Sequence, residues 1–147
     1  MLILVATDRE VVVMDVERGA GSPAHGIGGP PTCLAADPLV HGRAWCGTNR
    51  NGVFRTDDDG MSWRSVGLAG RVIMAISASP ADRDVVWVGT EPSEVWRSGD
   101  AGNTWEQTST LETLSSSSEW SFPPRPETHH VRWIGCHPLE QIGRAHV

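Results

Sequence analysis

The side chains best suited to chemistry gather in one stretch, residues 119–133. It holds two His, two Arg, two Glu and two Trp within fifteen residues, and three prolines stiffen it. An arginine can hold a carboxylate through paired hydrogen bonds, and a histidine can act as acid, base or metal ligand. The candidate ligand-binding residues are Glu119, Trp120, Arg125, His129, His130 and Arg132.

The end of this stretch has the alternation of a strand. His130 and Arg132 alternate with Val131 and Trp133, which predicts that the first two share one face of the strand. We expect this strand to lie nearest the axis about which the sheets are arranged, with Glu119, Arg125 and His129 converging there. The alternative is that His130 and Arg132 pair with a neighbouring sheet. The adjacent His129 and His130 have no third ligand at metal spacing, so we expect neither a metal site nor a cofactor.

A second group of acidic side chains belongs to an octapeptide that occurs twice, 42 residues apart. Residues 56–63 and 98–105 both read [S/T]-x-D-x-G-x-[S/T]-W, and each copy follows an arginine. In such a turn the Asp caps backbone N–H groups, the Gly adopts a conformation that other residues resist, and the Trp packs beneath. We therefore predict a structural role for Asp58, Gly60, Trp63, Asp100, Gly102 and Trp105. A catalytic pair formed by Asp57 and Asp59 is the alternative.

The repeat extends beyond the octapeptides without a gap. Four more positions recur 42 residues later: Pro38 as Pro80, Trp45 as Trp87, Gly47 as Gly89 and Thr48 as Thr90. Short apolar runs separated by turn residues indicate four strands in each unit. The predicted fold is therefore all-β, a β-propeller segment of about three four-stranded antiparallel blades.

The units occupy residues 2–28, 31–68 and 72–109, and a further unit starts at 129–138 after an insertion at 110–128. The first unit is a degenerate repeat in which Thr7 takes the place of Thr48. This unit begins at the second of its four expected strands. Strand parity puts the insertion on the end opposite the two repeated turns. A long loop on a rigid scaffold often carries function; a tether without function is the other interpretation of its Ser115–Ser118 run.

The two octapeptides resemble the Asp-box (BNR) repeats of sialidases, xyloglucanase-type glycoside hydrolases, sortilin-type receptors and photosystem II assembly factors. The box covers residues 55–63 and 97–105, and the wider repeat covers about 2–138. The inserted stretch looks like that of uncharacterised bacterial BNR-repeat proteins that are described as glycosyl hydrolase-like. This resemblance implies a sialidase-like propeller scaffold.

Nothing catalytic is carried over from the resemblance. Sialidases use an arginine triad with a Tyr nucleophile, whereas this chain has no Tyr, and no motif assigns Arg71, Arg125 or Arg132 to the triad. We therefore expect a non-catalytic propeller scaffold that binds a glycan, another anionic small molecule or a protein on the face opposite the boxes. The alternative is a glycoside hydrolase whose catalytic residues lie largely in a C-terminal half beyond this chain.

The composition of the chain limits which partners the protein is expected to bind and where in the cell it is expected to lie. A net charge of -6 argues against nucleic acid, and no apolar run approaches the ~20 residues of a membrane span. Without a signal-peptide pattern, the sequence predicts a cytoplasmic protein. Cys46 and Cys136 take the places of apolar residues in the repeat. We expect the chain to be part of a longer protein, and residues 142–147 match a translated sequencing adapter, so we expect them to lie outside the fold.

Overall fold

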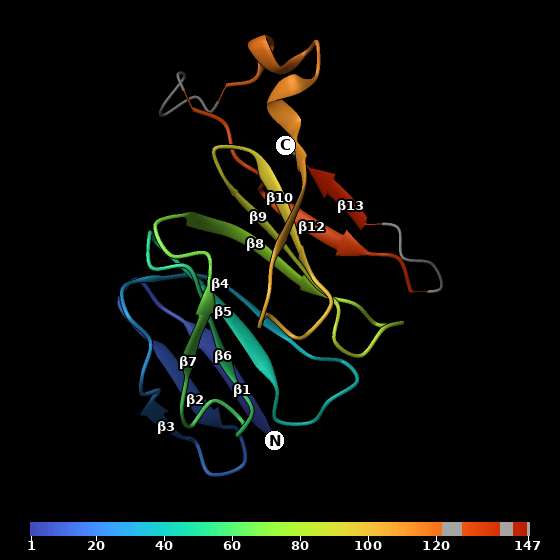
Figure 1. Cartoon of the computed structure of the whole chain (residues 1–147). Helices are drawn as coiled ribbons and strands as arrows, with labels where there is room; N and C mark the ends of the chain where they lie inside the picture. Colours follow the sequence, from blue (N-terminus) through green and yellow to red (C-terminus); the bar gives the residue numbers. More distant parts are fainter. Residues whose placement is uncertain (122–127, 139–142, 147) are drawn as a thin grey trace.

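The computed structural model describes residues 1–121, 128–138 and 143–146, and within these ranges the chain is all-β (Figure 1). The first sheet consists of β1 (Leu2–Ala6), β2 (Val11–Asp15) and β3 (Ala20–Pro23). The second consists of β4 (Pro31–Ala36), β5 (Ala44–Thr48), β6 (Val53–Thr56) and β7 (Arg64–Gly67). The third consists of β8 (Val72–Ala78), β9 (Val86–Glu91), β10 (Glu94–Ser98) and β11 (Glu106–Thr110).

All strand pairs are antiparallel, and within the described residues each sheet follows chain order. The insertion starts with two short 3-10 turns, η1 (Leu111–Thr113) and η2 (Ser117–Glu119). A last pair of strands follows, β12 (Trp133–Cys136) and β13 (Gly143–His146). The described part of the first sheet has three strands, in agreement with a first unit that begins at its second strand.

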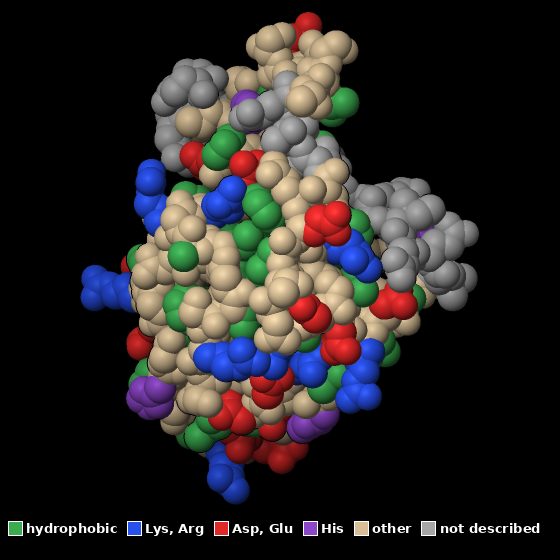
Figure 2. Space-filling view, in the orientation of Figure 1, with side chains coloured by type: hydrophobic (Ala, Val, Ile, Leu, Met, Phe, Trp, Pro, Cys, Tyr) green, Lys and Arg blue, Asp and Glu red, His purple; other side chains and the backbone are tan. Residues whose placement is uncertain are grey.

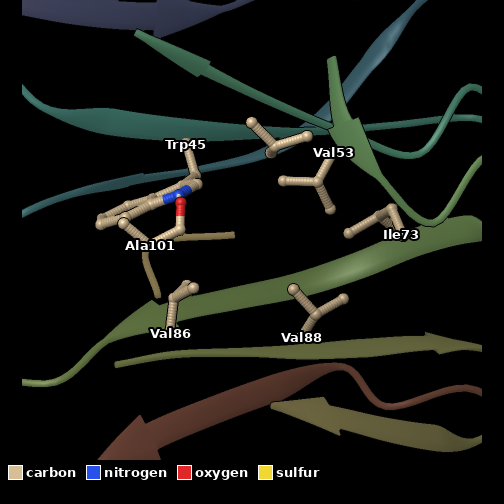
Figure 3. Close-up of a cluster of buried hydrophobic side chains, with 7 residues drawn as sticks. Trp45, Val53, Ile73, Val86, Val88 and Ala101 are labelled. Atoms are coloured by element: carbon tan, nitrogen blue, oxygen red, sulfur yellow. Dashed lines mark hydrogen bonds between the residues drawn. The ribbon is translucent and has the colours of Figure 1, made fainter. Parts of the chain in front are cut away.

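The first strands of successive sheets lie next to one another, β4 beside β8 and β8 beside β12, and β1 contacts β4. Apolar side chains fill the space between the second and third sheets. Trp45, Val53, Ile73, Val86 and Val88 are each 0% exposed in this cluster (Figure 3). Burying apolar surface stabilises a fold by about 25 cal/mol per Å², so this intersheet core holds the two repeats together.

The two repeated turns have the same internal hydrogen bonds. Asp100 Oδ1 accepts from the Ser98 hydroxyl at 2.7 Å and the Thr104 amide at 2.8 Å, and Asp100 Oδ2 accepts from the Thr104 hydroxyl at 2.7 Å. Asp58 makes the three matching bonds at 2.7, 2.9 and 2.6 Å. Gly60 and Gly102 have φ angles of 87° and 94°, a backbone conformation that favours glycine.

The two turn tryptophans lie in equivalent intersheet layers but bond differently. The Trp63 indole packs between the first and second sheets and donates to the Gly60 carbonyl of its own turn at 3.0 Å. The Trp105 indole packs at the next layer and donates to the Val66 carbonyl of the preceding sheet at 2.7 Å. The Trp105 indole lies against Gly67, where an added Cβ would be 3.0 Å from the ring. Because glycine has no side chain there, the indole can approach the preceding sheet closely enough to bond the Val66 carbonyl.

Ion pairs tie the repeated-turn end of the second sheet to the third. The Arg43 guanidinium bonds Asp84 at 2.7 Å and Asp57 at 3.2 Å, and it lies 3.6 Å from Asp37, whose side chain is 1% exposed. Burial lowers the pKa of Arg43, but its hydrogen bonds to Asp84 and Asp57 outweigh this and raise it. Figure 2 shows arginines in a row beside acidic side chains at this end. These contacts give Asp57 a structural role.

The position of residues 143–146 in the fold differs from what the sequence led us to expect. We expected the segment 142–147 to lie outside the fold, whereas Gly143–His146 pairs with β12 as β13. The edge of β12 offers a row of backbone N–H and C=O groups, and an extended segment of almost any composition can satisfy them. Pairing at this edge therefore does not depend on the sequence of the added strand.

Candidate functional site

A cavity of about 340 Å³ opens at the end of the sheets opposite the repeated turns. It lies where the β5–β6 turn, the β7–β8 connection, the β9–β10 turn and the end of the insertion meet (Figure 1). Its lining residues are Arg50, Gly70, Val72, Glu91, Pro92, Thr128 and His129. Charged and apolar groups from four separate segments thus line one hollow, the usual composition of a small-ligand site.

The β5–β6 turn positions the arginine of the cavity. Arg50 has a φ of 72°, the left-handed conformation found in tight turns. Its carbonyl accepts a hydrogen bond of 2.8 Å from the Gly70 amide, and an isolated bridge joins Asn49 to Val72. These bonds fix the turn to the β7–β8 connection, while the Arg50 residue as a whole remains exposed.

The β9–β10 turn is held by both ends of the insertion. The Ser93 carbonyl accepts from the Leu111 amide at 3.2 Å, where the insertion starts. The Ser93 hydroxyl, which is fully buried, lies 2.9 Å from His129 Nδ1, where the insertion ends. The Val131 amide then donates to the Thr90 carbonyl at 3.2 Å. These bonds hold the end of the insertion against the β9–β10 turn, where Glu91 and His129 line the same cavity.

Two of the predicted residues meet at the rim. The Trp120 and His129 rings pack edge to face, with centroids 5.7 Å apart and an angle of 83° between their planes. His129 lines the cavity, and Trp120, the residue that follows η2, contacts it through this ring pair without being one of the described lining residues. Glu119 is exposed and is not one of the described residues that line the cavity. Arg125 lies outside the described residues.

The predicted common face of His130 and Arg132 does not form. β12 starts at Trp133, so residues 130–132 precede the strand and its alternation does not apply to them. His130 is 7% exposed and Arg132 is exposed. His130 Nδ1 lies 3.9 Å from Glu91 Oε2, beyond hydrogen-bond range, and the pair attracts only when the imidazole is protonated.

Arg50, Glu91 and Ser93 belong to the site, although the sequence reasoning did not select them. They occupy the β5–β6 and β9–β10 turns, which strand parity places on the same end as the insertion. That parity argument located the insertion, and applied to the other turns it would have found these residues as well. Single polar residues in short turns carry no motif of their own.

The side chains that line the cavity are suited to binding a ligand through charged hydrogen bonds. Arg50 and His129 offer hydrogen-bond donors, and Glu91 offers acceptors. Glu91 is the one carboxylate among the described lining residues, whereas glycoside hydrolysis generally needs two. In the described ranges, no group of three or more His, Cys, Asp or Glu side chains could hold a metal ion. No helix in the described part is long and apolar enough to span a membrane.

Comparisons with known proteins identify the fold. No family model matches the chain, and no curated protein matches it. Among solved structures, the GH74 xyloglucanase from Xanthomonas campestris superposes with a TM-score of 0.65 at 17% identity, over 93% of this chain and 22% of that one. An ancestral GH74 enzyme superposes with a TM-score of 0.64 at 15% identity, over 72% of this chain and 16% of that one.

YCF48 bound to D1 peptide is also similar, with a TM-score of 0.50 at 15% identity, over 91% of this chain and 32% of that one. The chain therefore spans at most about a third of the length of these structures. These likenesses, together with the side-by-side antiparallel sheets, define the class: the chain is an all-β, partial β-propeller. The fold predicted from the repeat is confirmed.

Proposed function

We propose that this chain is part of a non-catalytic propeller with Asp-box (BNR) repeats that binds a ligand at the insertion end. The observation that carries the proposal is the cavity between Arg50, Glu91 and His129. A glycan or a carboxylate-bearing small molecule fits it best, because Arg50 can grip an anionic group while Glu91 accepts hydrogen bonds from hydroxyls. A protein that presents such groups is the related possibility.

The test is a binding titration of the chain, measured by calorimetry. The ligand panel consists of neutral glycans, acidic glycans and small carboxylates. Arg50→Ala should weaken binding of the best ligand at least about 10-fold, as expected for loss of a charged hydrogen bond. Its unfolding midpoint should stay unchanged, because the Arg50 residue is exposed.

Arg83→Ala is the matched control, since Arg83 is an exposed arginine in the β8–β9 turn at the other end. Arg43→Ala is unsuitable as a control, because Arg43 holds three carboxylates. Equal losses for Arg50→Ala and Arg83→Ala, or no binding by any member of the panel, would contradict the proposed site.

The second candidate function is a glycoside hydrolase whose remaining catalytic residues lie beyond this chain. It is supported by Glu91, a carboxylate that lines the cavity, because glycoside hydrolysis uses a pair of carboxyl groups of which Glu91 would be one. Hydrolysis assays on xyloglucan and aryl glycosides separate the two functions. Turnover by a longer form of the protein that is abolished by Glu91→Gln would favour the hydrolase, whereas binding without turnover favours the scaffold.

A further inference from the structure

The cavity at the insertion end lies beside two complete sheets. Its described lining residues fall between Arg50 and His129, and the second and third sheets that flank it each have four strands. Its volume of about 340 Å³ is at the small end of ligand cavities, which commonly measure about 300–1,000 Å³. The cavity is therefore sized for a ligand of one ring, such as a single sugar unit.

The cavity contains charges of both signs. Arg50 belongs to the β5–β6 turn, and Glu91 is the last residue of β9. A simple carboxylate is attracted by Arg50 and repelled by Glu91, so it gains little from entering. A carboxylate ligand that also carries hydroxyls can donate hydrogen bonds from these to Glu91 while Arg50 binds its acidic group. The pair of charges thus favours a ligand with both groups.

A buried hydroxyl holds His129 at the edge of this cavity. Ser93 Oγ lies 2.9 Å from His129 Nδ1, and Ser93 is 0% exposed. A buried hydroxyl normally donates its proton, and Nδ1 is within range to accept it. The neutral imidazole then carries its proton on Nε2, so His129 presents an N–H donor on the side away from Ser93. The edge-to-face contact with Trp120 limits rotation of the ring.

The same contact allows His129 to gain a charge without losing its position. A serine hydroxyl donates to a neutral imidazole and accepts from the Nδ1–H of an imidazolium, so the bond to Ser93 survives protonation of the ring. The charge of a histidine ordinarily changes between about pH 5 and 8. Protonation of His129 adds a positive charge to a lining that already contains Arg50.

The nearest charged groups fix the sign of the pH effect. Arg50 opposes protonation of His129, and Glu91 favours it. His130 is 7% exposed, and its Nδ1 lies 3.9 Å from Glu91 Oε2, so a proton taken up by His130 would offset the charge of Glu91. Uptake of a proton by either histidine therefore makes the cavity more positive, and its affinity for an anion rises as the pH falls.

Charged groups on the neighbouring segments change this balance little. Arg71 and Glu94 bond each other at 2.9 Å, so their charges largely cancel. Glu119, at the end of η2, and Arg132, which precedes β12, are exposed, and solvent and salt screen their charges. Among the described residues, Arg50, Glu91 and the two histidines therefore dominate the charge of the cavity.

We propose that His129, positioned by the Ser93 hydroxyl, makes this cavity select an acidic sugar, a single ring that carries both a carboxylate and hydroxyls. This inference rests on the ligand site proposed above and names its ligand class. The carboxylate of the sugar binds Arg50 and the Nε2–H of His129, and the hydroxyls donate to Glu91. Protonated His129 strengthens binding of the acidic sugar, whereas a neutral sugar gains nothing from that charge.

Three small ring compounds separate the parts of this proposal. Glucuronate carries a carboxylate and hydroxyls, glucose carries hydroxyls alone, and cyclohexanecarboxylate carries a carboxylate alone. In titrations of the full chain at pH 6, we expect glucuronate to bind at least about 10-fold more tightly than either of the others, as for one charged hydrogen bond. At pH 8 its advantage over glucose should fall by about 3-fold or more, because His129 is then neutral. The carboxylate of glucuronate stays ionised at both pH values, so the change reports on the protein.

Replacing His129 tests whether this residue causes the selection. His129→Gln keeps a hydrogen-bonding side chain but cannot take up a proton, so its preference for glucuronate over glucose should be nearly the same at pH 6 and pH 8. His41→Gln is the matched control, because the His41 side chain is 94% exposed at the repeated-turn end. This control should keep the pH dependence of the wild-type chain.

The role of Ser93 can be measured without any ligand. Long-range ¹H–¹⁵N NMR spectra distinguish protonated from unprotonated ring nitrogens, and His129→Gln assigns the signals of His129. At pH 8 we expect the proton on Nε2 in the wild-type chain and a mixture of the two neutral forms in Ser93→Ala, whose fold circular dichroism checks. A wild-type ring that carries its proton on Nδ1 at pH 8 would overturn the role of Ser93.

The binding results distinguish this inference from the ligand site on which it rests. Glucuronate binding that is lost in Arg50→Ala but is equal at pH 6 and pH 8, or that keeps its pH dependence in His129→Gln, would overturn the inference and leave the site in place. Binding of a neutral glycan through Arg50 without binding of glucuronate would do the same. Failure of every compound to bind at either pH would overturn both.

Discussion

Replacing Asp100 with Ala tests whether the repeated turn acts as a scaffold. The Asp100 carboxylate accepts three hydrogen bonds, two from Thr104 and one from Ser98. A hydrogen bond contributes about 0.5–1.5 kcal/mol net, and loss of a comparable side-chain cap costs about 0.5–2 kcal/mol. Because the Ser98 hydroxyl still bonds the Gly102 amide at 2.8 Å, part of the turn survives. We expect a loss of about 1–2 kcal/mol.

Thermal unfolding followed by circular dichroism measures this loss. For a chain of this size, the melting temperature should fall by about 3–6 °C. Asp100→Asn keeps one side-chain oxygen for the Thr104 amide and should lose about half as much. Asp8→Ala is the surface control, because the Asp8 side chain is 87% exposed, and it should change stability by less than about 0.5 kcal/mol.

The pH dependence gives a sharper test of the same carboxylate. Hydrogen bonds from the Thr104 hydroxyl, the Thr104 amide and the Ser98 hydroxyl lower the pKa of Asp100 from 3.8 to about 2. A pKa that is lower in the folded state stabilises the fold above pH 3.8, and this contribution is lost as the pH falls towards 2. The difference between wild type and Asp100→Ala should therefore be constant above about pH 5 and shrink steadily below it. Equal stability at pH 7, or a difference that persists unchanged at pH 2, would refute the scaffold role.

Three further outcomes follow from packing and burial. Gly47→Ala should destabilise the fold by about 1–3 kcal/mol in urea titration, since its Cβ would lie 2.5 Å from Ile73. Arg43→Ala should cost about 3–5 kcal/mol by the same measurement, because it leaves the buried Asp37 without its cation. Burial raises the pKa of the Cys46 thiol to about 12, so mass spectrometry should find it unalkylated by iodoacetamide at pH 8 and modified once urea unfolds the chain.

The repeat predicted the sheets because its signals are local. Apolar runs, turn glycines and the eight-residue motif each determine structure within a few residues, and the 42-residue period then sets the order of the strands. The bonds of Asp58 and Asp100 are local in the same way, since each partner lies within four residues. Patterns of this kind can be read without knowing which sheets become neighbours.

The parts that the sequence did not reveal depend on neighbours distant in the chain. Arg43 reaches Asp84 across 41 residues, and no pattern marks that pair. His130 was expected on a strand face, but the Val131 amide bonds Thr90 and is followed by a strand that starts only at Trp133. The alternation is present in the sequence, but it does not show that the strand begins only at Trp133 or that Val131 bonds a residue 41 positions earlier.

The two ends of the sheets differ in how their charges are used, and this difference favours one end for binding. At the repeated-turn end, Asp57 lies within 4 Å of Arg43, Arg55 and Arg64, so a ligand there must break existing ion pairs before it forms its own. A larger hollow of about 410 Å³ lies at that end, but the arginine that borders it, Arg43, is already paired with Asp57 and Asp84. At the insertion end, exposed Arg50 borders a cavity of about 340 Å³. An anion entering that cavity displaces mainly water, which costs less than displacing a carboxylate partner. The proposed ligand site at the insertion end is therefore supported by the pairing of charges at the opposite end as well as by the residues of the cavity.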